Sequence, residues 1–111
     1  MPFRGRPVHE MTATLFRVLG HPARVRILEL LRDGEQAAGA LSGALELDSG
    51  ATSQHLSGLR RIGLVESRRE GTSVLYRARD MQVYVLLEAA RAVILRQLEE
   101  QQIILQELED E

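Results

Sequence analysis

The sequence predicts a mainly α-helical fold with a single β-hairpin. Apolar residues recur at helical spacing in five segments, and two short β-type runs flank a Glu-Gly-Thr turn at residues 70–72. Hydrophobic residues make up 44% of the 111 residues and aromatic residues only 4%, so we expect one small domain with an aliphatic core.

Breakers and capping residues divide the chain into elements. We place Pro22 in the first turn of the second helix and Asp48 and Asp80 at the caps of the last two helices. The predicted helices span 9–19, 23–32, 36–45, 48–61 and 81–109, and the strands span 64–69 and 73–79. The resulting division is a flexible leader at 1–8, a core at 9–80 that includes a first dimerisation helix, and a long C-terminal dimerisation helix with an acidic tail at 81–111.

Composition excludes several classes of protein. The chain has no cysteine, which excludes disulfides, thiolate metal sites and thiol redox switches. We find no signal peptide and no apolar stretch long enough to cross a bilayer, so we expect a cytoplasmic protein without membrane contact. No glycine-rich phosphate loop or catalytic triad spacing is present, so we expect neither an enzyme nor a cofactor.

Charge is distributed unevenly along the chain. The formal net charge is -2, but residues 1–98 hold all 14 arginines and only 10 of the 16 acidic residues. Six arginines and two glutamates lie within residues 56–79, whereas residues 99–111 carry six acids and no base. The hairpin region is therefore locally basic, as a protein that contacts nucleic acid requires, and an acidic tail hides this in the total.

The element order helix, helix, short helix, helix, hairpin, long helix is that of a winged helix-turn-helix. We take residues 48–62 as the recognition helix, since a helix fits the DNA major groove and a flanking basic hairpin can reach phosphates. Its side chains are short and polar at the start and basic at the end, and Gln54 can pair with adenine through two hydrogen bonds. The predicted DNA-binding residues are Ser49, Thr52, Ser53, Gln54, His55, Ser57, Arg60, Arg61, Arg68, Arg69 and Thr72.

The last predicted helix is roughly 43 Å long at 1.5 Å per residue, which is too long for a domain of this size to cover. Its apolar stripe has the alternating three- and four-residue spacing of a helix-pairing seam. The stripe residues predicted to form a dimer interface are Val83, Leu87, Ala90, Ile94 and Leu98.

Two segments, LGHPARVRILELL (19–31) and TSQHLSGLRRIGLVESRREGTSVLYRA (52–78), together with the terminal helix, resemble the ArsR/SmtB family of bacterial repressors. The resemblance covers about residues 12–98. It implies a homodimer built from the first and last helices, which adds Leu15 to the interface, and a repressor that leaves a pseudo-palindromic double-stranded operator when it binds an effector.

The sensing residues of the family can be compared position by position. A Cys-x-Cys pair near the third helix corresponds here to residues 37–40, Ala-Ala-Gly-Ala. A second type of site uses Asp-x-His and later ligands, where this chain has Asp80 but Gln82, Val93 and Arg96. One carboxylate cannot hold a zinc ion that requires about four ligands, so the prediction is no metal site.

Several alternatives stay open. The same fold could serve as a protein-interaction module that does not bind DNA. It could also bind DNA and respond to a small-molecule effector that is unknown, or bind DNA and sense no effector. His55 could contact DNA or pack between helices, and His21 could cap its helix or form local hydrogen bonds. His9 could be a solvated side chain that pairs with carboxylates at the N-terminus, or could share a metal with acids of a partner's last helix. Arg68 and Arg69 could simply form a solvated strand edge.

Overall fold

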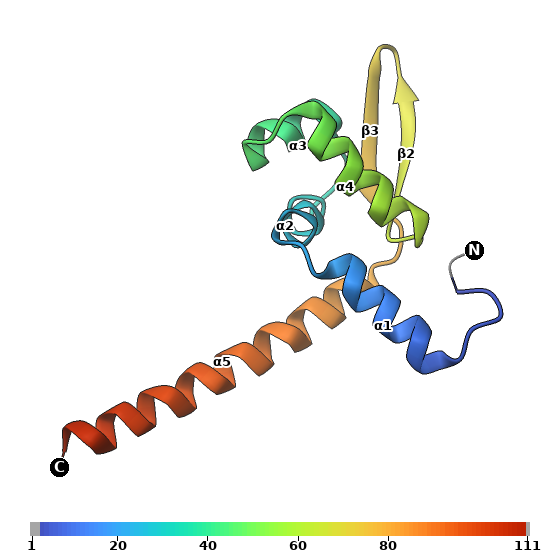
Figure 1. The fold of residues 1–111 in the computed structure, drawn as a ribbon. Coiled ribbons are helices and arrows are strands. Elements are labelled where there is room, and N and C mark those ends of the chain that lie inside the picture. The colour runs from blue at the N-terminus through green and yellow to red at the C-terminus, as the bar shows by residue number, and fades with distance from the viewer. Residues whose placement is uncertain (1–2, 111) are drawn as a thin grey trace. The chain divides into compact units, whose positions relative to one another are not determined.

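The computed structural model describes residues 3–110 and contains five helices and a small antiparallel sheet within that range (Figure 1). Residues up to Asp80 form one compact unit, and a second unit begins at Met81. The elements of the first unit are α1 (Val8–Leu19), α2 (Pro22–Leu30), β1 (Gln36–Ala37), α3 (Ala38–Leu45), α4 (Ser49–Arg61), β2 (Val65–Glu70) and β3 (Ser73–Ala78). The mainly α fold with a β-hairpin is confirmed.

Local signals account for several helix ends. Pro22 occupies the first turn of α2, as predicted, where its missing N–H costs no hydrogen bond. Asp48 caps α4, since its Oδ1 accepts a 2.7 Å hydrogen bond from the Ala51 backbone N–H. Gly63, which follows α4, has φ +80°, a conformation that suits glycine.

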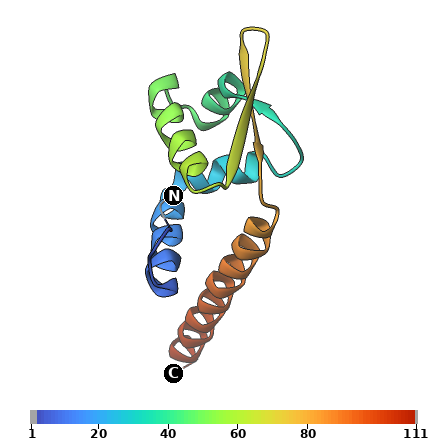
Figure 2. The same ribbon diagram turned by 90° about the vertical axis from the view of Figure 1, so that its right-hand side faces the viewer.

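The sheet has three strands in the order β1-β3-β2, and the hairpin turn lies well away from the helices of the first unit (Figure 2). Residue 70 pairs with residue 73, which leaves Gly71 and Thr72 as a two-residue turn, and Gly71 has φ +63°. The short strand β1 was not predicted, because residues 36–45 read as one helix. Its two residues pair with Leu75 and Tyr76 of β3, an interaction that no local pattern in residues 36–45 encodes.

The core of the first unit is aliphatic, as predicted. Its buried apolar residues are Leu19, Ile27, Leu28, Leu31, Leu41, Leu56, Leu59, Leu64 and Val65. This core joins α1, α2, α3, α4 and the start of β2, so it holds α4 and the hairpin in one rigid unit.

An arginine locks α2 to α4. Arg24 Nε donates to His55 Nδ1 over 3.1 Å, and Arg24 Nη1 donates to the Val18 carbonyl over 3.2 Å. The guanidinium lies directly against Gly58, where an added Cβ would stand 2.7 Å from Arg24 Cζ. Gly58 therefore leaves room for the Arg24 guanidinium, which a larger residue would displace.

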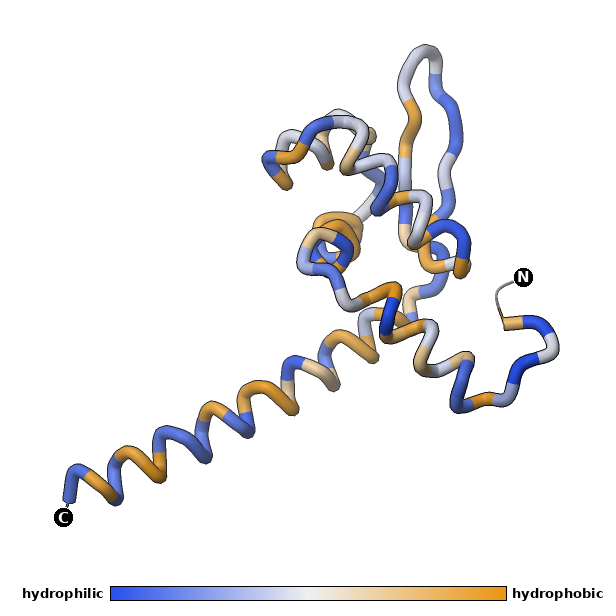
Figure 3. The backbone as a smooth tube through the Cα atoms, viewed as in Figure 1, coloured by the Kyte–Doolittle hydropathy of each residue, from blue (hydrophilic) through white to orange (hydrophobic). Residues whose placement is uncertain are grey.

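The second unit contains α5 (Gln82–Glu109), a helix of 28 residues. Its N-cap position is Met81 rather than the predicted Asp80. Along the helix, hydrophobic and hydrophilic residues alternate in short groups (Figure 3). Residues 1–2 of the predicted leader and residue 111 of the predicted acidic tail lie outside the described residues.

Candidate nucleic-acid interface

Helix α4 presents two different faces. Thr52, Leu56 and Leu59 are buried, and they recur at the four- and three-residue spacing of one helix face. The residues of the opposite face are exposed, and they are Ser49, Ser53, Gln54, Ser57, Arg60 and Arg61. Since the buried face is anchored in the core, the polar face is held rigidly toward solvent.

Thr52, one of the predicted DNA-binding residues of α4, is buried. Thr52 is 1% exposed and its hydroxyl donates to the Asp48 carbonyl over 2.9 Å, so it serves the helix and is not available to a ligand. The sequence pattern had placed Thr52 among the exposed residues of this helix, and that placement is wrong. The small polar side chain is tolerated in the core because its hydroxyl is satisfied within its own helix.

His55 is half-buried and packs between helices. Its Nδ1 accepts the hydrogen bond from Arg24, and its ring centroid lies 5.6 Å from that of His21. Burial, and then the charges of Arg24 and His21, lower the pKa of His55, so the neutral imidazole that accepts this bond is favoured near pH 7. Of the two roles left open for His55, the structure shows the packing role. The ring of His21 takes part through this contact and makes no side-chain cap on α2.

Arg68 and Arg69, which are adjacent in β2, lie on opposite faces of the hairpin. Alternation along β2 places Ser67 and Arg69 on one face, and places Glu66, Arg68 and Glu70 on the other. Arg60 of α4 donates to the Ser67 hydroxyl over 3.2 Å, so the Ser67–Arg69 face is the one that adjoins the recognition helix.

Arg68 is engaged in ion pairs on the far face. Its Nε and Nη2 donate to the two carboxylate oxygens of Glu35 over 2.9 and 2.7 Å, and Nη2 also donates to Glu70 over 2.9 Å. The hydrogen bond from Arg68 lowers the pKa of Glu35 and raises the pKa of Arg68. Two carboxylates therefore balance this guanidinium, although the pair is exposed and screened by solvent.

Arg69 and Thr72 are exposed on the hairpin and its turn. Within residues 3–110, no hydrogen bond or ion pair engages the Arg69 side chain. Arg77, by contrast, pairs with Glu66 across the strands. Carboxylates thus balance much of the positive charge of the hairpin, and Arg69 is left available on the face that adjoins α4.

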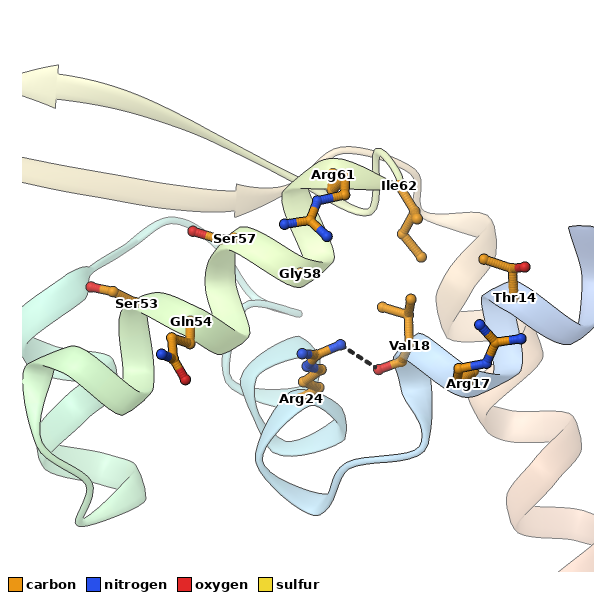
Figure 4. Close-up of a pocket in the computed structure, with 10 residues that line it drawn as sticks. All are labelled: Thr14, Arg17, Val18, Arg24, Ser53, Gln54, Ser57, Gly58, Arg61 and Ile62. Atoms are coloured by element: carbon orange, nitrogen blue, oxygen red, sulfur yellow. Dashed lines mark hydrogen bonds between the residues drawn. The ribbon is translucent and has the colours of Figure 1, made fainter. Parts of the chain in front are cut away.

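Two further arginines, which the sequence pattern does not reveal, lie beside the recognition helix. Arg17 of α1 and Arg24 of α2 line an open cleft together with Gln54 and Arg61 of α4 (Figure 4). Their separation in the sequence conceals this grouping, since only the packing of α1 and α2 against α4 brings them together.

Potential metal ligands, which are His, Cys, Asp and Glu side chains, do not form clusters of three within the described residues. The whole chain lacks cysteine. The neighbouring pair His21 and His55 lies beside the Arg24 guanidinium, whose charge opposes a cation.

The predicted dimer residues differ in exposure. Val83 is 5% exposed and Leu87 and Leu15 are half-buried, whereas Ala90, Ile94 and Leu98 are exposed. Beyond Leu98, the exposed large apolar residues are Ile103, Ile104, Leu105 and Leu108. In the part of the chain that the structure describes, no helix is both long and apolar enough to span a membrane.

Comparisons with known proteins agree with this architecture. The model of the bacterial regulatory protein arsR family matches residues 21–67. The HTH-type transcriptional regulator Rv0081 of Mycobacterium tuberculosis is 39% identical over 103 residues, which cover 92% of this chain and 90% of that protein. The transcriptional activator HlyU of Vibrio cholerae is 40% identical over 74 residues, which cover 67% of this chain and 68% of that protein.

Solved structures extend the similarity to the fold. The crystal structure of Rv0081 superimposes with a TM-score of 0.79 at 38% identity, covering 87% of this chain and 98% of the other. The solution structure of the homodimeric winged helix-turn-helix DNA-binding domain of Mb0332 from Mycobacterium bovis gives a TM-score of 0.71 at 31% identity, covering 87% and 94%. The chain is therefore a member of the ArsR family of bacterial transcriptional regulators and has their winged helix-turn-helix DNA-binding fold.

Proposed function

We propose that this protein is a homodimeric, sequence-specific repressor that binds a pseudo-palindromic operator and lacks the metal and thiol inputs of its family. The observation that carries the proposal is the two-faced α4, whose buried residues anchor it while Ser53, Gln54 and Ser57 face solvent. Such a helix can enter a major groove without rearrangement of its core.

Different side chains serve different parts of recognition. Gln54 and the serines of α4 read base edges, whereas Arg60, Arg61 and Arg69 neutralise phosphates and Thr72 approaches the backbone from the turn. Arg68 is excluded from this set because its guanidinium is committed to Glu35 and Glu70 on the other face.

Dimerisation follows from the exposed apolar residues of α5. Ile94 and Leu98 are 59% and 54% exposed, and a helix with such a stripe gains free energy by burying it against another copy. We assign this pairing to α5 with support from Leu15 of α1. The similar Mb0332 domain is described as homodimeric, which supports dimerisation of this chain.

Repression follows from occlusion. A dimer bound at an operator that overlaps a promoter would block access to that promoter, which is the basis on which repression is proposed. The Vibrio relative is named as an activator, so the sign is read from transcription of a template that carries the selected operator.

Gln54→Ala should weaken binding to the operator by about 1–3 kcal/mol and relax discrimination at one base position, because the variant cannot form the bidentate pair with adenine. Binding to a scrambled duplex should change little. The measurement is fluorescence anisotropy on an operator selected from random duplexes, with the exposed Gln36→Ala as the matched control. Equal losses on both duplexes would show that α4 does not read bases, and a wild type without any duplex preference would favour a protein-interaction module.

Arg69→Ala should weaken operator and scrambled duplexes alike, because binding to a phosphate carries no sequence information. The slope of log affinity against log salt should become shallower by about 0.9 for each phosphate that is no longer neutralised. Arg68→Ala removes the same charge from the other face of β2 and should leave the slope closer to that of the wild type. The assignment of the faces is wrong if Arg68→Ala has the larger effect on the slope.

Leu98→Glu should shift the protein from dimer to monomer and abolish operator binding, because it places a charge in the apolar stripe of α5. Ala92 lies on the side of the same helix that is opposite the stripe, so Ala92→Glu should leave the dimer intact. Sedimentation or light scattering over a concentration series measures both. A wild-type chain that stays a folded monomer of 12.4 kDa at high micromolar concentration would contradict the proposal.

Zn(II), Cd(II) and As(III) should leave operator binding unchanged, because no cysteine is present and the family positions hold Gln82, Val93 and Arg96. Anisotropy of the preformed complex, titrated with each ion and then with a chelator, measures this. A stoichiometric metal complex that releases the DNA would overturn this part of the proposal.

A further inference from the structure

An open cleft of about 500 Å³ lies between α1, α2 and α4 (Figure 4). Arg17 enters it from α1, Arg24 from α2 and Arg61 from α4, while Ser53, Gln54 and Ser57 line it along α4. All of these residues belong to the first compact unit, so the cleft does not depend on α5.

The chemistry of this cleft suits an anion. Three guanidinium groups line it, and no carboxylate is among its lining residues, which also offer hydroxyl and amide groups. A guanidinium presents a planar fork of N–H donors that matches the oxygens of a phosphate group. A phosphate is therefore the ligand that the lining favours.

One of the three arginines is already held in position. Arg24 is fixed by its bonds to His55 Nδ1 and to the Val18 carbonyl, and its guanidinium rests on the bare backbone of Gly58. These hydrogen bonds use Nε and Nη1, whereas no hydrogen bond within residues 3–110 uses Nη2. A group that is ordered before binding loses less conformational entropy when a ligand arrives.

The position of the cleft indicates which phosphate it takes. Ser53, Gln54 and Ser57 belong both to the cleft and to the exposed face of α4 that is proposed to read bases. When a helix lies in the major groove, the sugar-phosphate strand that borders the groove runs along the flank of that helix. A phosphate of that strand would meet the three arginines, and the open mouth of the cleft suits a polymer.

We propose that the cleft between α1, α2 and α4 binds a phosphate of the DNA backbone through Arg17, Arg24 and Arg61, along the flank of the recognition helix. This inference rests on the proposed DNA-binding function and extends the DNA-binding surface to α1 and α2.

The test couples a protein change to a DNA change. Operator duplexes in which single phosphates are replaced by neutral methylphosphonates are measured by anisotropy with wild type, Arg17→Gln and Arg26→Gln. Arg17 and Arg26 are both exposed, but Arg26 lies outside the cleft, and its Nη1 is 3.7 Å from Glu29 Oε1. Arg26→Gln is therefore the control for loss of one charge. We expect one position per half-site at which methylphosphonate weakens wild type and Arg26→Gln by about tenfold or more, and Arg17→Gln by much less.

Gly58→Ala tests the position of Arg24 without altering any charge. The new methyl group would displace the Arg24 guanidinium and break its hydrogen bonds to His55 and Val18, while the higher helix propensity of alanine offsets part of the lost stability, so the variant should remain folded. We expect weaker binding to all duplexes and a smaller methylphosphonate effect at the same position. Wild-type affinity in a variant that is folded by circular dichroism would overturn the role of Arg24.

Calorimetric titration of the DNA-free protein with pyrophosphate at constant ionic strength separates the two sources of phosphate. The proposal predicts no saturable binding. Saturable binding that Arg17→Gln abolishes, without a coupled methylphosphonate position, would assign the cleft to a free phosphate compound and overturn the DNA assignment. A wild type that binds the operator with no coupled position overturns this inference alone, whereas a wild type that prefers no duplex overturns the proposed function with it.

Discussion

The surface proposed to meet DNA depends on how α4 is anchored. Thr52, Leu56 and Leu59 fill the core, and Arg24 crosses the same helix at Gly58 and is held by His55. Protein interiors are close-packed and do not deform continuously. A helix that is fixed along one face therefore presents its other face in one orientation. Rigid presentation of Ser53 and Gln54 follows from that burial.

The arrangement of charge on the hairpin also depends on which face each side chain occupies. The hairpin carries several arginines, but its strands also carry acids, and the alternation of side chains decides which charges compensate one another. Arg68 and Arg77 meet carboxylates on one face, whereas Arg69 on the other face has no such partner within residues 3–110. A count of arginines therefore overestimates the unpaired positive charge that the hairpin presents to DNA. The face on which each arginine lies decides whether it pairs with a carboxylate or stays available.

Local features of the sequence were sufficient for most of the fold. The order of helices and hairpin, Pro22 in the first turn of α2 and the Asp48 cap all follow from interactions within a few residues. The errors arise where distant segments meet. Strand β1 exists because β3 pairs with it, and the pairing of Arg68 with Glu35 joins residues 33 positions apart. Thr52, by contrast, lies on the same helix face as Leu56 and Leu59, so helical spacing indicates its burial, and it was misplaced because its side chain is polar.

The cap of α4 is consistent with the proposal that phosphates are bound at the sides of this helix. The N-terminus of a helix ordinarily attracts a phosphate through its free N–H groups and its dipole. Here Asp48 occupies that position: its carboxylate accepts the Ala51 N–H and brings a negative charge to the end of the helix that would face DNA. The cap stabilises α4, and its negative charge disfavours an anion at the N-terminus of the helix. This supports the proposal that phosphates are bound by arginines that flank the helix, which are Arg69 on the hairpin and the three arginines of the cleft between α1, α2 and α4.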